Sequence, residues 1–226
     1  MKRLNAKVVA AVIAIVCACS LFAARVHQVN AEAYHRVEEI HETGERFALD
    51  GSFAEYAYEN TKEYSLEVTG ANIMSCNEYL ERYGEDEYEY TKYDDTDRDA
   101  PTLVVLDMVI ERGGTRGDVP PVEELGYLDS LGWSLICNDA RNLWLRVDTG
   151  LFATSVPQIE GAFQLAVLPG TSFEVHVPFC TTFAKDFPSP IGEDYRPVLE
   201  EGAYTLAVTN VPVRHMVEIV AKRFRP

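Results

Sequence analysis

The sequence predicts a mainly β protein: an antiparallel β-sandwich with one short helix, preceded by an N-terminal transmembrane helix. Two observations predict the sandwich. The apolar stretches are short, and turns rich in glycine and proline separate them. Tyr64, Leu66 and Val68, for example, alternate with polar residues, which is the period-two pattern of a half-buried strand. A chain of 226 residues has room for the membrane segment and one domain with a sizeable core.

The membrane segment is predicted from an apolar run at residues 8–24. Lys2, Arg3 and Lys7 precede this run, so the positive-inside rule places the N-terminus in the cytoplasm and the remainder outside the cell. As a helix the run would be about 25 Å long, which lies between a signal peptide and a full membrane span. We predict a retained single-pass signal anchor in residues 1–26, which contacts the membrane through residues 8–24.

Two other fates of this run stay open. Cleavage after Ala31 would release a secreted protein, although Arg25 lies between the apolar run and that site. Lipidation of Cys19 would give a lipid-anchored envelope protein, although the residues after it remain apolar. In each case the rest of the chain leaves the cytoplasm.

The charge of the exported part narrows the range of partners. The first 31 residues hold four basic and no acidic side chains, so residues 32–226 carry a formal charge of −20 where the whole chain carries −16. A surface of that sign repels nucleic acid and anionic lipid headgroups. No nucleic-acid partner is therefore expected.

The expected strands follow a stalk. Residues 27–46 are assigned to the stalk and a first edge strand near 37–40, and residues 47–226 to the sandwich. Eight further strands are expected at residues 64–69, 102–110, 133–137, 143–147, 163–168, 173–177, 204–209 and 216–221. Strands this short and this numerous favour a single antiparallel sandwich.

One helix is expected between the first two of these eight strands. Ser75 followed by Glu78 forms a capping box, and Gly84 provides a left-handed stop after about two turns. We expect this helix to close one end of the sandwich.

Three cysteines lie outside the apolar run: Cys76, Cys137 and Cys180. An odd number in an exported chain is compatible with one disulfide plus one thiol or with three thiols. Cys137 shares the phase of the apolar residues Trp133 and Leu135 and is expected to be buried. Cys180 is expected to be more accessible, but no base accompanies it.

The sharpest local feature is the acidic stretch at residues 85–99. Asp95, Asp97 and Asp99 repeat at every second position, as at the start of a calcium-binding EF-hand loop. The loop is incomplete, because Ala100 and Leu106 stand where glycine and glutamate are required. These three aspartates are the predicted metal ligands, in a looser calcium site, and the alternative is a solvated loop.

No other metal and no cofactor is expected. His35 and His41 fall in the stalk, His176 alternates with apolar residues and so lies on the polar face of its strand, and the histidines lack the spacing of a zinc motif. The sequence also has no nucleophile elbow and no phosphate-binding glycine loop. The protein is therefore not expected to be an enzyme.

Two stretches are candidate binding surfaces. Tyrosines recur in acidic sequence at residues 56–58 and 88–93, where exposed rings suit the recognition of sugars or proteins. The connection at residues 180–197 is long for a sandwich and contains three prolines, so it offers a second surface.

Several short motifs carry a resemblance to a known family. They are Arg25-Val26, Val29-Asn30, Gly44-Glu45, Leu49-Asp50, Phe53, EYSLEV at 63–68, SCNEYLERYG at 75–84, LVVLDMVIER at 103–112, LPGT at 168–171 and VPF at 177–179. The chain resembles an uncharacterised domain-of-unknown-function family of Gram-positive bacterial surface proteins with one N-terminal membrane segment and an immunoglobulin-like β-sandwich. The resemblance implies this fold and a surface location, and it carries no catalytic residue. The turn at Arg112-Gly113-Gly114 departs from the family pattern.

The expected function is that of a membrane-anchored extracellular binding or interaction module, whose partner is the cell wall or another protein. An exported glycan hydrolase that uses a pair of carboxylates is the alternative from a different class. A structural component of a larger envelope complex is a third reading.

Overall fold

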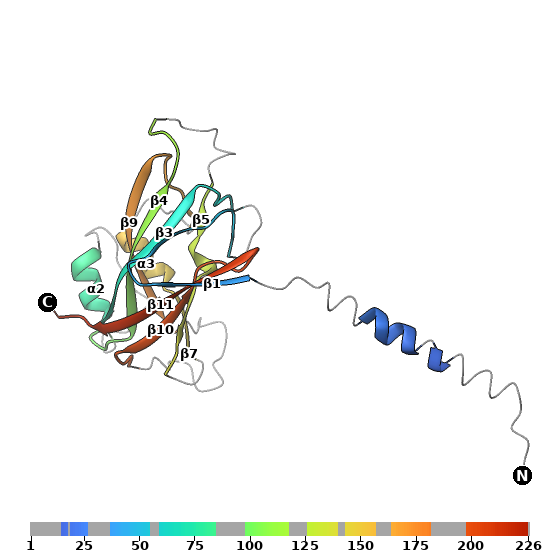
Figure 1. Cartoon of the computed structure of the whole chain (residues 1–226). Helices are drawn as coiled ribbons and strands as arrows, with labels where there is room; N and C mark the ends of the chain where they lie inside the picture. Colours follow the sequence, from blue (N-terminus) through green and yellow to red (C-terminus); the bar gives the residue numbers. More distant parts are fainter. Residues whose placement is uncertain are drawn as a thin grey trace, which may run out of the picture. The chain divides into compact units, whose positions relative to one another are not determined.

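The computed structural model describes most of the chain. The described residues are 15–17, 19–26, 37–54, 59–84, 98–117, 126–139, 143–156, 164–181 and 198–225. The chain divides into two compact units, Met1–Arg36 and Val37–Pro226 (Figure 1).

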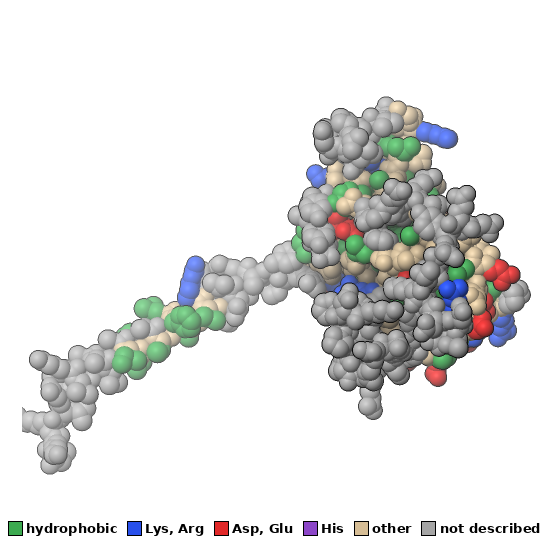
Figure 2. Space-filling model, turned by 180° about the vertical axis from the view of Figure 1, so that it is seen from behind, with side chains coloured by type: hydrophobic (Ala, Val, Ile, Leu, Met, Phe, Trp, Pro, Cys, Tyr) green, Lys and Arg blue, Asp and Glu red, His purple; other side chains and the backbone are tan. Residues whose placement is uncertain are grey.

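The first unit contains helical residues at 15–17 and 19–26. Its large apolar side chains are exposed: Ile15, Val16, Leu21, Phe22 and Val26. Hydrophobic side chains are visible along this segment in Figure 2. Within the described part of the chain, no helix is long and apolar enough to cross a membrane. Residues 8–14 and 18 of the apolar run that predicts the anchor lie outside the described residues, so the anchor stays a prediction.

The second unit is built around one large sheet. Its nine strands are β1 (Val37–Glu42), β2 (Arg46–Ala48), β3 (Tyr64–Met74), β4 (Leu103–Arg112), β6 (Ser134–Cys137), β7 (Leu143–Val147), β9 (Thr171–Cys180), β10 (Gly202–Ala207) and β11 (Val213–Arg223). Strands β5 (Leu128–Asp129) and β8 (Gln164–Leu165) form a separate two-stranded ribbon. The helices are α2 (Cys76–Tyr83), α3 (Thr149–Ser155) and a 3-10 turn at Ser130–Gly132.

The large sheet closes on itself. Its strand order is β1-β11-β10-β6-β7-β9-β4-β3-β2, and β11 also pairs with β3 through Lys222 opposite Asn72 and Arg223 opposite Ile73. Seven strands, from β3 round to β11, therefore form a closed barrel. Closure follows from the length of the strands, because β3, β4, β9 and β11 have 10 or 11 residues each and long twisted strands bring the two ends of a sheet together.

The mainly β class is confirmed, whereas the arrangement of the strands differs from the expected immunoglobulin-like sandwich. A sandwich has two separate sheets, and here the strands of both expected layers are joined into one barrel. The sheet is also mixed, since β1 and β3 both pair with β11 in parallel. The alternation of apolar and polar residues is the same on a barrel wall and on a sandwich layer, so the sequence does not separate them.

Near its start, strand β4 is apolar on both faces because both faces are buried. Val104, Leu106 and Met108 point into the barrel and belong to its core, which also holds Trp133. Leu103 and the other outward residues near the start of β4 belong to a second cluster outside the barrel wall. A strand that is covered on both sides reads as continuously apolar, as observed.

The second cluster is covered by two helices. Its buried members are Met74, Cys76, Tyr79, Leu103, Val105, Leu151 and Cys180. Helices α2 and α3 thus pack side by side against the outer wall of β3, β4 and β9. The expectation that α2 closes an end of the domain is wrong, because the apolar face of α2 meets the side of the barrel.

The start of α2 agrees with the sequence and its end does not. The Ser75 Oγ accepts a hydrogen bond from the Glu78 N–H at 3.1 Å, and the Glu78 carboxylate accepts one from the Ser75 N–H at 2.6 Å, which confirms the capping box. Gly84 has φ −71° and is extended rather than left-handed. Glycine is required there for a steric reason, because a Cβ would lie 2.6 Å from the Leu80 carbonyl oxygen.

Helix α3 was not expected, because Asp148-Thr149-Gly150 has the composition of a turn. The Asp148 Oδ1 caps the helix and accepts from the N–H groups of Gly150 and Leu151, both at 3.1 Å. An aspartate that caps a short helix and an aspartate in a turn look alike in sequence. The apolar residues Leu151 and Phe152 that follow were the available signal for a helix.

Candidate functional site

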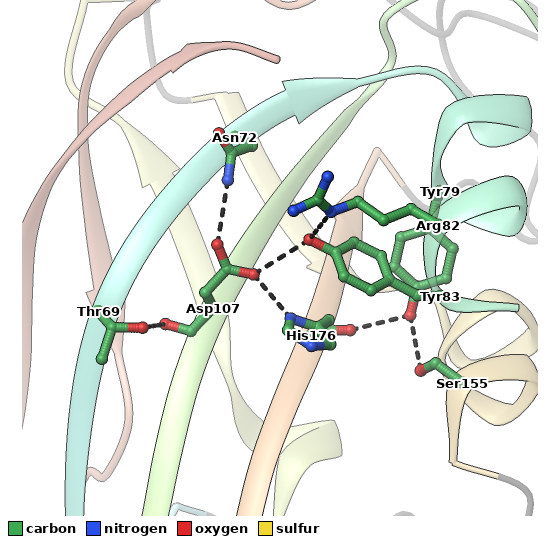
Figure 3. A network of polar contacts seen from close by, with 8 residues as sticks. All are labelled: Thr69, Asn72, Tyr79, Arg82, Tyr83, Asp107, Ser155 and His176. Atoms are coloured by element: carbon green, nitrogen blue, oxygen red, sulfur yellow. Dashed lines mark hydrogen bonds and ion pairs between the residues drawn. The ribbon is translucent and has the colours of Figure 1, made fainter. Parts of the chain in front are cut away.

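A polar network lies on the outer wall of the barrel, beside α2 (Figure 3). Asp107 in β4 and His176 in β9 are register partners, and the His176 Nδ1 lies 2.7 Å from the Asp107 Oδ1. Both side chains are partly exposed. An imidazole held by a carboxylate on an accessible wall is the feature from which the rest of the site is built.

The backbone of β3 makes room for this carboxylate. The register of β3 against β4 shifts between Val68 and Gly70, which marks a β-bulge. A Cβ on Gly70 would lie 3.2 Å from the Asp107 Oδ2, so a larger residue would crowd the carboxylate. The Asn72 Nδ2 then donates a hydrogen bond to the same oxygen at 3.1 Å. The bulge, the glycine and the asparagine together fix the position of Asp107.

Helix α2 contributes an aromatic ring and a guanidinium group. The Tyr83 ring stacks on the His176 imidazole, with centroids 4.0 Å apart and planes inclined by 17°. The Tyr83 hydroxyl donates to the Asp107 Oδ1 at 3.4 Å and accepts from the Arg82 Nε at 3.0 Å. Burial, and then the negative charge of Asp107, raise the pKa of Tyr83, so the ring stays neutral.

A second tyrosine of α2, Tyr79, connects the site to the neighbouring elements. The Tyr79 hydroxyl lies 2.9 Å from the backbone carbonyl oxygen of His176 and 2.8 Å from the Ser155 Oγ of α3. Burial raises the pKa of Tyr79. This contact ties α2, α3 and β9 together and holds the network on a rigid base.

The arrangement has a definite hydrogen-bonding capacity. A neutral His176 whose Nδ1 proton points to Asp107 keeps its Nε2 as an acceptor. Arg82 is exposed and its guanidinium offers donors. Acceptors and donors therefore lie close together around an aromatic ring, which suits a ligand rich in hydroxyl groups. The same carboxylate-held imidazole has the form of a general base.

The predicted calcium ligands are only partly described. The Asp99 carboxylate accepts a hydrogen bond from the Asn77 Nδ2 of α2 at 2.7 Å, so it lies beside the helix. Asp95 and Asp97 lie outside the described residues, and the calcium site stays a prediction. The tyrosines at 56–58 and 88–93 and most of the connection at 180–197 also lie outside them.

All five cysteines lie among the described residues, and no disulfide joins any of them. The expectation that Cys180 is accessible is wrong, because it is 4% exposed beneath the helices and its Sγ donates to the Asp148 Oδ2 at 3.4 Å. Cys137 packs against the barrel core as expected but is only partly buried.

The histidines differ from the sequence expectations in one respect. His176 lies on the polar face of its strand, as expected. His41 lies in β1 rather than in a stalk, and its Nε2 is 3.2 Å from the Nδ1 of His215 in β11. Nothing in the sequence signals that β1 pairs with the last strand, because 174 residues separate the two histidines.

The pairing of Asp107 with His176 was also missed. The available signals were Asp107 in the apolar stretch TLVVLDMVI and His176 in the stretch FEVHV, where it alternates with apolar residues. Each is a polar residue with apolar neighbours on both sides, and only the register of β4 against β9 brings them together.

The comparisons with known proteins support one part of the resemblance, a family of unknown function. No curated protein and no solved structure matches the chain. A family model described as "Domain of unknown function (DUF5028)" matches residues 38–215, which is most of the chain, from β1 to β11. The chain therefore belongs to the DUF5028 family.

Proposed function

We propose that this protein is a binding domain held at the outer face of the cell membrane, and that it recognises a hydroxyl-rich wall glycan through the Asp107–His176 network. The observation that carries the proposal is the partly exposed pair itself, with Arg82 and Tyr83 beside it. Asp107 is an acid between the apolar residues Leu106 and Met108 of its strand.

The location rests on the N-terminal sequence. Basic residues precede the apolar run, so the positive-inside rule favours export of the barrel. Exposed apolar side chains on the described helical residues of the first unit support a membrane contact. Cleavage after Ala31 and lipidation of Cys19 would change the attachment and leave the barrel outside.

The ligand class rests on the chemistry of the network. Hydroxyl groups donate and accept hydrogen bonds, which matches the carboxylate, the imidazole and the guanidinium of this site. A neutral glycan is favoured over an anionic polymer, because residues 32–226 carry a formal charge of −20.

Cosedimentation of the full chain with insoluble peptidoglycan tests the proposal. The chain is purified in a mild detergent, and the peptidoglycan is stripped of covalently attached anionic polymers. Wild type is expected to sediment with it, and His176→Ala and Arg82→Gln are expected to bind at least about fivefold more weakly. Glu174→Gln is the matched control, since Glu174 is exposed on the same strand as His176. Equal sedimentation of all four proteins would remove the network as the binding site.

A glycan hydrolase is the second candidate, favoured by the imidazole that Asp107 orients. The same incubations distinguish the two functions. A binding domain leaves the glycan intact, whereas a hydrolase releases new reducing ends that Asp107→Asn abolishes.

The mass of the protein recovered from membranes tests the attachment. An intact chain is expected for the anchor, a chain without its first 31 residues indicates secretion, and a diacylated Cys19 indicates a lipoprotein.

A further inference from the structure

Three side chains meet where β1 joins the barrel, away from the strands that carry the Asp107–His176 network. Strand β1 runs parallel to β11 with Glu39 opposite His215, and His41 lies two residues further along β1. Residues i and i+2 of a strand share a face, so all three side chains project to the same side of the sheet. We call Glu39, His41 and His215 the seam cluster.

The ligand atoms of the seam cluster already have the spacing of a metal site. The His41 Nε2 lies 3.2 Å from the His215 Nδ1, the Glu39 Oε2 lies 3.6 Å from the same nitrogen, and all three atoms lie within 4.8 Å of one another. A tetrahedral zinc ion with bonds of about 2.0 to 2.1 Å holds its ligand atoms about 3.3 to 3.4 Å apart. We propose that the seam cluster binds a divalent transition-metal ion of the zinc type.

The contacts of His41 beyond the cluster fit this role. Its second nitrogen, Nδ1, lies 3.1 Å from the Glu45 Oε1, which is the carboxylate–histidine pairing that orients histidine ligands in metal sites. The Phe47 ring stacks on the imidazole at 3.8 Å and 3°. The ring of His41 is thus held with its Nε2 facing His215.

The two histidines of the seam cluster are buried. His41 and His215 are 7% and 3% exposed, and the His41 Nε2 faces the His215 Nδ1. When both imidazoles are neutral, one proton can be shared in a hydrogen bond between the His41 Nε2 and the His215 Nδ1. A metal ion takes the place of that proton and binds both nitrogen lone pairs, as well as the Glu39 carboxylate.

Access and charge are also suitable. The Glu39 side chain is half exposed, at 52%, so solvent reaches one side of the site and water can supply a fourth ligand. Two neutral histidines and Glu39 leave a divalent ion with one excess positive charge, and the nearby Glu45 balances it. Nitrogen ligands select zinc-type ions over calcium and magnesium, which prefer oxygen.

Zinc titration of the full, tag-free chain tests the proposal. After treatment with chelator, calorimetric titration with zinc chloride is expected to give one saturable site, and the melting temperature is expected to rise with zinc because the ion joins β1 to β11. Calcium at the same concentration is expected to leave this site empty. No saturable zinc binding would overturn the proposal.

Two matched variants locate the site. Glu39→Gln removes one ligand from an exposed side chain and is expected to raise the zinc Kd at least about tenfold. Glu38→Gln removes the same charge from the neighbouring position, where the carboxylate accepts from Arg214, and is expected to leave the zinc Kd within about twofold. Equal effects of the two substitutions would contradict the assignment. Because Glu39 is exposed, the result does not depend on whether variants of the buried histidines fold.

Cobalt distinguishes the seam cluster from the cysteine thiols of the chain. Cobalt bound by nitrogen and oxygen ligands is expected to show visible ligand-field absorption without a sulfur-to-cobalt charge-transfer band. A charge-transfer band that accounts for the bound cobalt would place the ion on cysteine and overturn the proposal.

Discussion

The hydroxyl of Tyr64 accepts a hydrogen bond from the backbone N–H of Val167 at 3.2 Å. The same hydroxyl donates to the carbonyl oxygen of Gly126. Tyr64 belongs to β3 and is fully buried, whereas its two partners lie in the segments that lead to β5 and follow β8. One side chain of the barrel therefore secures both segments of the small ribbon.

Tyr64→Phe is expected to lower the free energy of unfolding by about 1 to 3 kcal/mol, because it leaves a buried N–H and a buried carbonyl without a partner. Urea denaturation followed by circular dichroism measures this change in the free energy of unfolding. Tyr83→Phe is the comparison, since Tyr83 is partly exposed and water can replace its hydroxyl. Equal losses for the two variants would contradict the bridging role of Tyr64.

Gly126→Ala is expected to destabilise the domain strongly, by about 3 kcal/mol or more, because the new Cβ would lie 1.8 Å from the Asn60 carbonyl oxygen. Gly113→Ala is the matched control. A Cβ there meets only the Glu63 carbonyl oxygen at 3.6 Å, an ordinary contact. Thermal melts of both variants measure the difference, and a Gly126→Ala protein as stable as Gly113→Ala would show that the two backbone segments separate freely.

Alkaline pH is expected to unfold the domain through its buried tyrosines. Burial raises the pKa of Tyr79 and of Tyr204, so the folded state favours the neutral phenols. Their contribution to stability is complete below the unfolded pKa of about 10 and is lost as the pH rises above it. Above pH 10, each of these two tyrosines is expected to lower the free energy of unfolding by about 1.4 kcal/mol for every further pH unit.

Urea denaturation between pH 9 and 11.5, together with tyrosinate absorbance, measures this slope. Tyr204→Phe is expected to reduce the slope by about 1.4 kcal/mol per pH unit. A slope that is unchanged in this variant would show that the Tyr204 hydroxyl, which donates to the Glu200 carbonyl at 2.9 Å in the fold, ionises there without cost.

Asp107→Ala is expected to change the tautomer of His176. In wild type a neutral ring is expected to carry its proton on Nδ1, because the Asp107 carboxylate lies 2.7 Å away. Without that carboxylate the proton is expected to move to Nε2. Nitrogen-15 shifts of the imidazole report the tautomer, and Glu174→Ala, on the same strand, is expected to leave it on Nδ1. An Nε2–H tautomer already present in wild type would remove the acceptor from the proposed binding site.

The local elements could be predicted where the signal is short-ranged. The capping box of Ser75 and Glu78 marks α2, and the apolar stretch at 103–110 marks β4, because both signals depend on a few neighbouring residues. Strand β7 was likewise expected at residues 143–147, the bounds that it has.

The closure of the barrel and both polar clusters could not be predicted in this way. Barrel closure depends on two residue pairs between β11 and β3, and nothing about Lys222 or Asn72 distinguishes them in sequence. The Asp107–His176 contact joins residues 69 positions apart and depends on strand register. Asp107, flanked by apolar residues in β4, was the informative position, and its partner became visible only in three dimensions.

Strand β1 follows the first unit directly and pairs in parallel with β11 of the barrel, with six register pairs from Val37–Val213 to Glu42–Glu218. A pull on the chain before Val37 against the end of β11 slides these two strands along each other, so their hydrogen bonds share the load and must break together. An antiparallel first strand pulled from the same end would instead peel off one bond at a time. The domain is thus built to resist mechanical force applied through its N-terminal connection.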